Sequence, residues 1–462
     1  MKSQWQHGES LLVVFVCVWA VCIASRPASA APPIRIGSKV TAQGQQPPTN
    51  AYCETKLGFE CLGPPDIRTA YGLTSLLNSG FTGVGETIVI IDSYGSPTID
   101  EDLKQFDSDY GIPDPPSFQV LAPLGTVPFD PTQPDQIGWA YETTLDVEWA
   151  HAIAPGASIV LLTSPVDETQ GVQGLPEFLK LEQYALEHHL GKIISQSWAA
   201  TENTLFPNVA GPQGPALIAA FNELFQDAAA QGVTVLAAAG DGGSQNAATY
   251  SEALGAPTSY YTFPTVNFPA SSPWVTSVGG TTLNVDAKDH YLFETVWNDD
   301  SIGAGAGGGG ISQLFGEPLY QLFTLSPKTQ EKLGGHRGIP DVSYNADDYN
   351  SAIFIYLSFL GPSNAGYYLI GGTSEGSPQW AGIVADLNQR AGFPLGFLNP
   401  RLYALGGLDK FSRYGRDIAL GNNAYGGVPG YSAGPGWDPV SGWGTPNLSH
   451  VQDWWSDFVR TN

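Results

Sequence analysis

The run ETIVIIDSY, residues 86–94, decides the fold class. It is short, apolar and rich in β-branched residues, which is typical of a strand buried on both faces. Four further runs share this pattern: ASIVLLTS (157–164), GKIISQSW (191–198), GVTVLAAAG (232–240) and PWVTSVGG (273–280). Between them lie longer segments with helical spacing, residues 138–154, 175–190 and 215–231. Buried strands that alternate with helices predict an α/β fold with a mostly parallel central sheet and helices on both faces.

The amino terminus has the pattern of a secretory signal. Lys2 precedes an apolar run, and the sequence ASA ends at Ala30 as an A-x-A cleavage site. The apolar run is short for a spanning helix, which makes a membrane anchor the weaker alternative. We therefore predict a secreted protein with a signal peptide (1–30), a short leader (31–63) and one domain (64–462). The run GAGAGGGG (303–310) could be a flexible linker, but structured-looking segments flank it.

The charge of the chain limits its partners. Without residues 1–30 it has 17 basic and 43 acidic residues, a net charge of −26. Such a chain is not expected to bind nucleic acid or an anionic membrane. In acid its carboxylates protonate and its self-repulsion weakens, although an acidic composition is also compatible with ordinary solubility.

Two cysteines, Cys53 and Cys61, remain after the signal peptide. In an oxidising compartment they would pair and close a short loop. They could also be two inert thiols, because the sequence does not give their separation.

Glu142 and Asp146 are candidates for acid–base chemistry. They lie four residues apart in a predicted helix, which places both carboxyl groups on one face with Cβ atoms about 5–6 Å apart. Two neighbouring carboxylates cannot both ionise freely, so one pKa rises and that group can act as a base or carry a proton in acid. The alternative is a solvated helix face. The apolar neighbours of the pair favour burial.

Two further residues lie where catalytic loops are expected. Asp241 follows a predicted strand in the Gly-rich run AAAGDGG, where it is either a turn residue or a protonated hydrogen-bond donor. Ser374 lies in GGTSEGSP, where a loop becomes a helix whose first N–H groups are unpaired. It is either a nucleophile or an N-cap, with Pro378 in the first turn.

Together these motifs resemble those of the sedolisins, the serine-carboxyl peptidases. The resemblance covers residues 64–447 and includes SQSWAATE, NFPASSPWVTSVGGT, ETVWND, RGIPDVSYNAD and GPGWDPVSGWGTPN. It implies a subtilisin-like fold and makes residues 64–462 a peptidase catalytic domain. Asp92, in IIDSYG, resembles a subtilisin Asp segment and is interpreted as a strand-end support beside the carboxyl pair.

The resemblance also implies a role for each candidate. Ser374 would be the nucleophile and Glu142 the general base. Asp146 would orient and polarise Glu142, and Asp241 would be the acid that donates a hydrogen bond in the oxyanion hole. Substrate would lie extended between residues 197–199 and 307–310.

One structural Ca²⁺ ion is implied near the carboxyl end. Its ligands would be the carboxylates of Asp417 and Asp438 and the carbonyls of Ile418, Gly434 and Gly436. Carboxylate and carbonyl oxygens suit a hard cation. Without the resemblance, a Gly-rich surface loop would be the simpler interpretation.

The sequence thus predicts a secreted, monomeric endopeptidase that cuts proteins or peptides in acid. A tripeptidyl exopeptidase of the same family is the alternative. A glycosidase that uses the acid pair, or a catalytically inactive binding module, fits the full set of four polar residues less well. Sedolisins usually carry a long prodomain, and about thirty residues separate the signal from the catalytic-type sequence. We therefore expect folding without a prodomain or with a separate helper chain.

Overall fold

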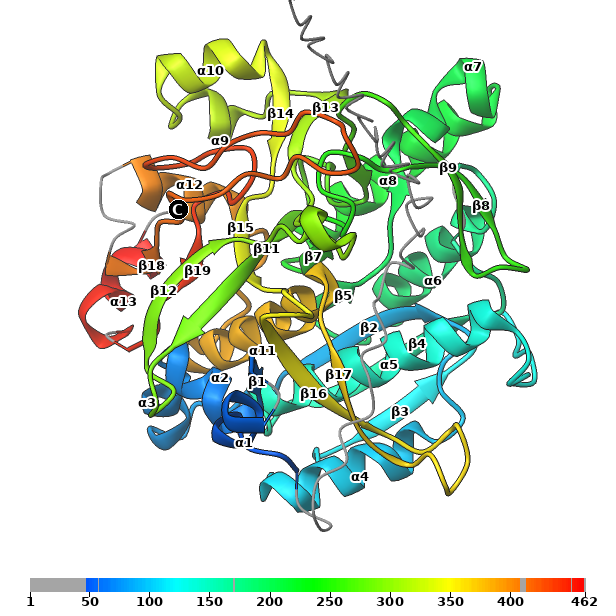
Figure 1. Ribbon diagram of the computed structural model, residues 1–462. Helices are drawn as coiled ribbons and strands as arrows, with labels where there is room; N and C mark the ends of the chain where they lie inside the picture. Colours follow the sequence, from blue (N-terminus) through cyan, green and yellow to red (C-terminus); the bar gives the residue numbers. More distant parts are fainter. Residues whose placement is uncertain (1–46, 57, 169–170, 408–412, 450, 461–462) are drawn as a thin grey trace, which may run out of the picture.

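The computed structural model describes residues 47–56, 58–168, 171–407, 413–449 and 451–460 (Figure 1). The predicted signal peptide and the leader up to residue 46 lie outside this range. None of the helices in the described segments combines the length and the apolar run that crossing a bilayer requires.

A sheet of eight strands forms the centre of the molecule. Its order is β12-β11-β7-β5-β2-β4-β3, and β15 also pairs with β11. Every pairing in it is parallel except that of β12 with β11, which confirms the mostly parallel prediction. The strands are β2 (Thr87–Ser93), β3 (Phe118–Leu121), β4 (Ser158–Ser164), β5 (Ile193–Gln196), β7 (Thr234–Ala238), β11 (Thr276–Val285), β12 (Tyr291–Val296) and β15 (Val342–Asn345).

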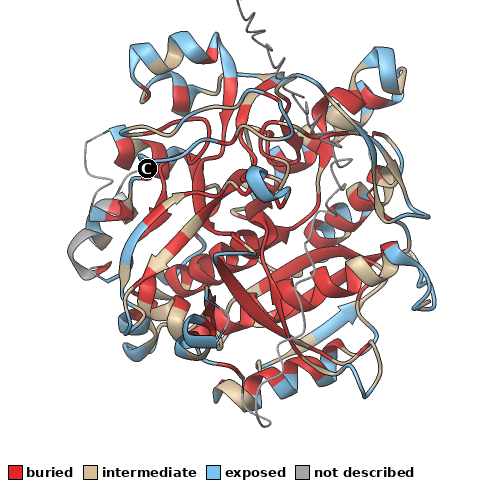
Figure 2. Ribbon diagram, in the orientation of Figure 1, coloured by how far each residue is buried: buried red, intermediate tan, exposed pale blue. Residues whose placement is uncertain are grey.

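Helices cover both faces of this sheet, as predicted (Figure 1). Helices α5 (Pro134–Ile153) and α11 (Thr373–Ala391) lie on one face, and α6 (Leu175–Glu187) and α8 (Gln213–Ala230) lie on the other. Strand β2 explains the division, because side chains alternate along a strand. Ile88 and Ile90 belong to the apolar cluster of α5 and α11, whereas Val89 and Ile91 belong to that of α6 and α8. Figure 2 shows the resulting buried centre and exposed outer helices.

Smaller elements surround this core. The other helices are α1 (Asn50–Lys56), α2 (Pro64–Ala70), α3 (Leu73–Asn78), α4 (Ile99–Tyr110), η1 (Glu202–Leu205), α7 (Pro207–Ala210), η2 (Asp300–Ile302), α9 (Leu319–Leu322), α10 (Pro327–Leu333), α12 (Asn399–Gly407) and α13 (Val451–Arg460). The other strands are β1 (Glu60–Leu62), β6 (Ala200–Thr201), β8 (Ala247–Ser251), β9 (Ala256–Tyr260), β10 (Asn267–Phe268), β13 (Gly310–Gly316), β14 (His336–Ile339), β16 (Ser351–Leu357), β17 (Gly366–Ile370), β18 (Gly415–Arg416) and β19 (Thr445–Pro446).

The glycine run at residues 303–310 is packed chain, not a linker. The Ala306 N–H donates to the Asp241 carbonyl at 2.9 Å, and the Gly243 N–H donates to the Ala306 carbonyl at 2.8 Å. A Cβ at Gly308 would lie 2.3 Å from the Ala239 carbonyl oxygen. Glycine is therefore required at position 308, because a side chain there would collide with the backbone at Ala239.

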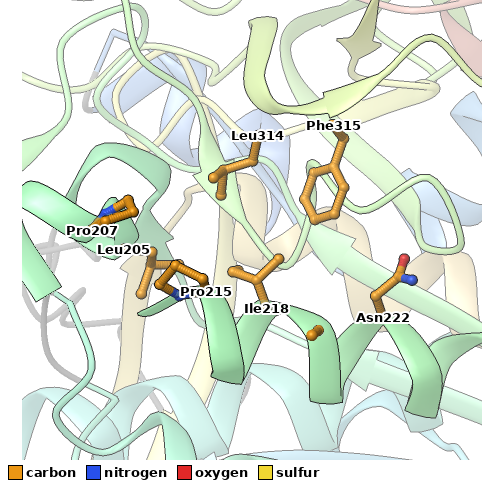
Figure 3. Close-up of a pocket in the computed structure, with 8 residues that line it drawn as sticks. Leu205, Pro207, Pro215, Ile218, Asn222, Leu314 and Phe315 are labelled. Atoms are coloured by element: carbon orange, nitrogen blue, oxygen red, sulfur yellow. The ribbon is translucent and has the colours of Figure 1, made fainter. Parts of the chain in front are cut away.

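An apolar pocket of about 300 Å³ lies between α8 and β13 (Figure 3). Leu205, Ile218, Leu314 and Phe315 are among the side chains that line it. None of the predicted catalytic residues contributes to its lining.

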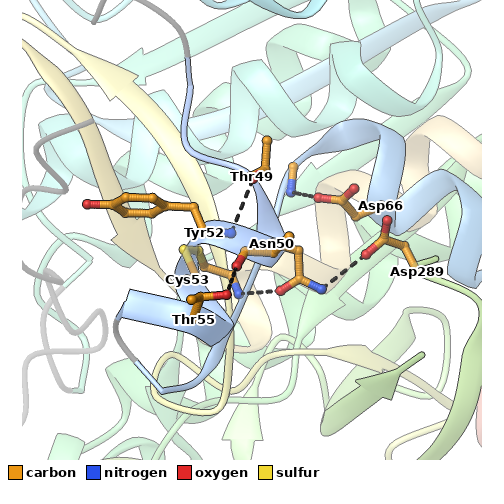
Figure 4. Close-up of a disulfide and its surroundings, with 10 residues drawn as sticks. Thr49, Asn50, Tyr52, Cys53, Thr55, Asp66 and Asp289 are labelled. Carbon is orange, nitrogen blue, oxygen red and sulfur yellow. Dashed lines mark hydrogen bonds between the residues drawn. A yellow bond between two sulfur atoms is a disulfide. The ribbon is translucent and has the colours of Figure 1, made fainter. Parts of the chain in front are cut away.

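The described residues ahead of Pro64, 47–56 and 58–63, are folded onto the domain. Cys53 and Cys61 form a disulfide with a Cα–Cα distance of 5.9 Å, which decides between the two alternatives left open by the sequence (Figure 4). Both cysteines and Leu62 are fully buried in the main apolar cluster, and β1 pairs with β16. The packed chain therefore begins before the predicted boundary at Pro64.

Candidate active site

The predicted catalytic residues meet at the carboxyl ends of the central strands. Catalytic groups gather at this edge in open parallel sheets, because the strands all end there. Asp92 is near the end of β2, Ser197 directly follows β5, and Asp241 follows β7. Helix α5 contributes Glu142 and Asp146, and helix α11 contributes Ser374.

Helix α5 carries two carboxyl groups into the interior. From Trp139 to Ile153 every residue of this helix is buried, because α5 is enclosed by β2 of the sheet, by α11 beside it, and by α4 and β16. Glu142 is 2% exposed and Asp146 is 0% exposed. A solvated helix face is therefore excluded.

Asp92 joins this pair from β2, on the face that carries Ile88 and Ile90. Burial raises the pKa of Asp92 to about 7 and raises the pKa of Glu142 and of Asp146 well above their ordinary values. The charge of Asp92 raises the pKa of both neighbours further. Three buried carboxyl groups in mutual contact cannot all ionise, so protons are held in this cluster.

Ser374 is the second residue of α11, and its side chain lies close enough to the Glu142 carboxyl group to lower the pKa of Glu142. The N-cap is Gly372, and Pro378 lies inside the helix. The N-cap interpretation of Ser374, with Pro378 in the first turn, is therefore wrong. Proline has no N–H to donate to the carbonyl four residues earlier, which is that of Ser374.

Ser197 occupies the place left by that missing hydrogen bond. Its hydroxyl lies 3.3 Å from the Ser374 carbonyl oxygen and 2.9 Å from Oδ1 of Asp146, to which it donates. Ser197 also lowers the pKa of Glu142 through a side-chain hydrogen bond. This hydroxyl thus connects both carboxyl groups of α5 to the start of α11.

Asp241 follows β7 and faces the same helix start. Its Oδ1 accepts the Thr373 N–H at 2.7 Å and the Thr373 hydroxyl at 2.8 Å. Burial raises the pKa of Asp241 to about 7, although both hydrogen bonds from Thr373 lower it. Desolvation therefore exceeds the stabilisation of the anion, and the carboxyl group keeps its proton in mild acid.

The predicted calcium ligands form one loop cluster. The Gly434 N–H donates to Asp438 and the Gly436 N–H donates to Asp417, each at 2.8 Å. The Ser441 hydroxyl links Oδ1 of Asp438 to the Ile418 carbonyl. Burial raises the pKa of Asp438 to about 6 and also raises that of Asp417. These are desolvated carboxyl groups that a bound cation would stabilise in the ionised form, so the residues present fit a hard metal ion.

A second acidic cluster, which the sequence did not predict, consists of Asp299, Asp347 and Asp348. One oxygen of each lies within 4.8 Å of the others. Asp299 and Asp347 are hydrogen-bonded to each other, and burial together with the charge of Asp347 raises the pKa of Asp299 to about 7. The cluster supports the loop after β15, where the Ala346 carbonyl accepts the Gly372 N–H.

The sequence missed two polar contacts in the site. Ser197 was expected only at the substrate edge, and Thr373 was not singled out. Ser197 belongs to the predicted substrate edge, residues 197–199, and Thr373 directly precedes Ser374. A hydroxyl residue at a strand end or a helix start is the available signal, but it is too common to identify a partner.

Comparison with known proteins agrees with this geometry. The Subtilase family model (Peptidase S8) matches residues 138–400. Kumamolisin from Bacillus sp. (strain MN-32) is 37% identical over 83% of this chain, and sedolisin from Pseudomonas sp. (strain 101) is 30% identical over 86%. The chain belongs to the sedolisin family. Tripeptidyl-peptidase 1 from Homo sapiens is another sedolisin-type relative, 30% identical over 66% of the chain.

A solved structure shows the same fold. Pseudomonas sedolisin, described as a serine-carboxyl proteinase complexed with two molecules of pseudo-iodotyrostatin, superposes with a TM-score of 0.68 at 27% identity. The match covers 86% of this chain and 99% of that one. The chain spans 61% of the kumamolisin and sedolisin sequences and 50% of human tripeptidyl-peptidase 1. The subtilisin-like fold of the sedolisin family is thereby confirmed for this chain.

Proposed function

We propose that this protein is a serine-carboxyl peptidase that hydrolyses proteins or peptides in acid. The observation that carries the proposal is the placement of Ser374 beside Glu142, whose pKa it lowers, within a buried cluster of carboxyl groups. A serine becomes a nucleophile when an adjacent base removes its proton. Here a buried glutamate occupies the position of that base.

The proposed reaction has two halves. Ser374 Oγ attacks the substrate carbonyl while Glu142 accepts its proton, and Glu142 then returns the proton to the leaving amine. Water hydrolyses the acyl-enzyme by the same route in reverse. Asp146 can hold a proton while Glu142 is ionised, because coupled carboxyl groups share protons, and Ser197 fixes its orientation.

Asp241 is proposed to stabilise the oxyanion by donating a hydrogen bond. A carboxyl group can donate only while it is protonated, and the pKa of Asp241 is about 7. The rate should therefore fall as the pH rises through this region. At lower pH it should fall again when the Glu142 cluster takes up its last proton.

Substrate is proposed to pair with the backbone of residues 197–199 and 307–310. Strand pairing gives affinity through main-chain hydrogen bonds and leaves side-chain preference to local pockets. Internal cleavage is our first proposal. The tripeptidyl mode is the second, supported by the similarity to human tripeptidyl-peptidase 1.

We further propose that the protein is secreted, acts as a monomer outside membranes, and binds one structural Ca²⁺ ion. The ion would be held by the carboxylates of Asp417 and Asp438 with carbonyls of Ile418, Gly434 and Gly436, and its chemistry would be structural. The support is the close packing and raised carboxyl pKa values of this loop cluster. Secretion is supported by the sequence pattern of residues 1–30 and by a disulfide, which persists in oxidising compartments.

A digest of an unfolded protein at acid pH tests the function. The products of the unmodified enzyme and of Ser374→Ala are compared by mass spectrometry. Internal cuts that vanish in the variant would support the endopeptidase, and tripeptides released in order would support the exopeptidase. No cleavage by the unmodified enzyme would refute both.

A further inference from the structure

Three hydrogen bonds converge on Asp241 through Thr373. The Gly240 N–H donates to Thr373 Oγ1 at 2.9 Å. The Thr373 hydroxyl and the Thr373 N–H then donate to the same oxygen, Oδ1 of Asp241, at 2.8 Å and 2.7 Å. Thr373 is buried, and it directly precedes Ser374 at the start of α11.

The direction of these hydrogen bonds is fixed by the backbone. An N–H group can only donate, whereas a hydroxyl group donates one proton and accepts two. The Thr373 N–H makes Oδ1 of Asp241 an acceptor, and the Thr373 hydroxyl, which accepts the Gly240 N–H, donates its own proton to the same oxygen. Oδ1 of Asp241 therefore receives two donors and is occupied as an acceptor. When Asp241 is neutral, its own proton belongs on Oδ2.

Oδ2 lies against the chain that leads to Ser374. A Cβ built on Gly372 would be 2.6 Å from Oδ2 of Asp241, and Gly372 has a φ of +114°. A side chain at this position would strain the backbone and displace the carboxyl group. The chain thus keeps Oδ2 within reach of the backbone two residues before the nucleophile.

We propose that Thr373 is a positioning residue that confines the acidic proton of Asp241 to Oδ2, from which it is donated to the substrate oxyanion. The inference rests on the proposed roles of Asp241 and Ser374, and it adds the group that orients the donor. Thr373 forms and breaks no covalent bond in this scheme. Its hydroxyl and N–H decide which oxygen of the carboxyl group is the donor.

The charged group that faces Asp241 is Glu142 of α5, and Asp241 in turn raises the pKa of Glu142. Thr373 acts in the opposite direction on Asp241, because donors to Oδ1 stabilise the ionised form and lower its pKa. Removing the Thr373 hydroxyl should therefore raise the pKa of Asp241. The same change should slow the reaction, because the proton is no longer confined to Oδ2.

The experiment compares Thr373→Val, which keeps the shape, with Thr373→Ser, which keeps the hydroxyl. In Thr373→Val we expect kcat to fall about tenfold with little change in KM, and the falling limb of the pH profile to move to higher pH. Thr373→Ser should restore both. Thr234→Val is the matched control, because it removes a buried hydroxyl bonded to the Gly396 carbonyl at the far end of β7. Thr234→Val should leave the falling limb of the pH profile at the same pH as in the unmodified enzyme.

A second measurement does not require turnover. In Ser374→Ala protein labelled with ¹³C at aspartate carboxyl carbons, the Asp241 signal is assigned by its loss in Asp241→Asn and followed through a pH titration. Its midpoint should rise in Thr373→Val and return in Thr373→Ser. An unchanged or lowered midpoint, or a serine variant as slow as the valine variant, would overturn the role of Thr373. Absence of peptide cleavage by the unmodified enzyme would instead overturn the proposed function, while the titration would still decide where Thr373 directs its hydrogen bonds.

Discussion

Replacing Asp92 with asparagine should flatten the pH dependence of stability. Asp92 is fully buried, and burial raises its pKa from 3.8 to about 7. A group whose pKa is higher in the folded state binds its proton more tightly there, so its contribution to stability is complete below the unfolded pKa of about 3.9. That contribution is lost as the pH rises through the folded pKa. Asparagine has nearly the same shape and cannot lose a proton.

The magnitude follows from the size of the shift. The whole shift of roughly three pKa units at 1.36 kcal/mol each corresponds to about 4 kcal/mol of unfolding free energy, of which about 3 kcal/mol is lost between pH 4 and pH 7, because these limits lie at the unfolded and the folded pKa. Glu142 and Asp146 should change in the same direction, because the charge of Asp92 raises the pKa of both. In Asp92→Asn their pKa values should fall, which adds to the flattening.

Urea unfolding at pH 4, 5, 6 and 7 measures this effect. Both proteins should carry Ser374→Ala, so that self-digestion does not distort the transitions. The Asp92→Asn protein should lose about 3 kcal/mol less stability over this range than its parent. Asp114→Asn is the control, because it removes a carboxyl group from the exposed surface. Parallel stability curves for Asp92→Asn and its parent would refute the reasoning.

Three further predictions concern catalysis and metal binding. Ser374→Ala should abolish turnover and leave the fold intact, and substantial proteolysis by the purified variant, beside an unchanged circular dichroism spectrum, would contradict the nucleophile assignment. Chelation of Ca²⁺ should lower the thermal midpoint, since a ligand bound only by the folded state stabilises it. An unchanged midpoint, with no metal in the purified protein, would remove the site at Asp417 and Asp438. Asp241→Asn keeps a donor at every pH, so it should retain some activity and move the falling limb of the rate profile upward. If the falling limb of Asp241→Asn lies at the same pH as that of the unmodified enzyme, the protonated-donor mechanism is contradicted.

The sequence predicted the central sheet well because burial on both faces leaves a strong pattern. The runs at residues 86–94 and 157–164 each contain four consecutive apolar residues, IVII and IVLL, and they became β2 and β4 within one residue at each end. The antiparallel hairpin β8–β9 and the pair β16–β17 were not predicted. Strands β8 and β9 are half-exposed and mix polar with apolar residues, so they lack that pattern.

The sequence predicted which residues form the candidate site, but it did not predict which of them contact one another. Motif order pointed to Glu142, Asp146, Asp241 and Ser374, and the structure places them at one edge of the sheet. The contact of Ser197 with Asp146 and with the Ser374 carbonyl depends on the packing of α5, β5 and α11 against each other. Such a contact joins residues far apart in the chain, and no local pattern encodes it.

Buried carboxyl groups outside the catalytic cluster behave in the same way as those within it. Burial raises the pKa of Asp66, Asp135 and Asp299 to about 7, as it does for Asp92 and Asp241. Each shift has the same sign, so each group favours folding in acid and opposes it as the pH rises towards neutrality. The pH range in which the fold is most stable is therefore the range in which Asp241 holds its proton.

A fall in activity towards neutral pH would accordingly combine two processes that can be separated. Ionisation of Asp241 is a local titration, and it reverses at once when the pH is lowered. Ionisation of carboxyl groups throughout the core lowers the free energy of unfolding, and unfolded chains are exposed to digestion by the remaining active enzyme. Asp241→Asn removes the local titration together with one of the carboxyl groups that oppose folding, whereas Asp92→Asn removes such a group and leaves Asp241 in place, so the two variants together separate the processes. The acid catalysis that we propose and the acid stability that we expect would thus share one physical cause, the desolvation of carboxyl groups.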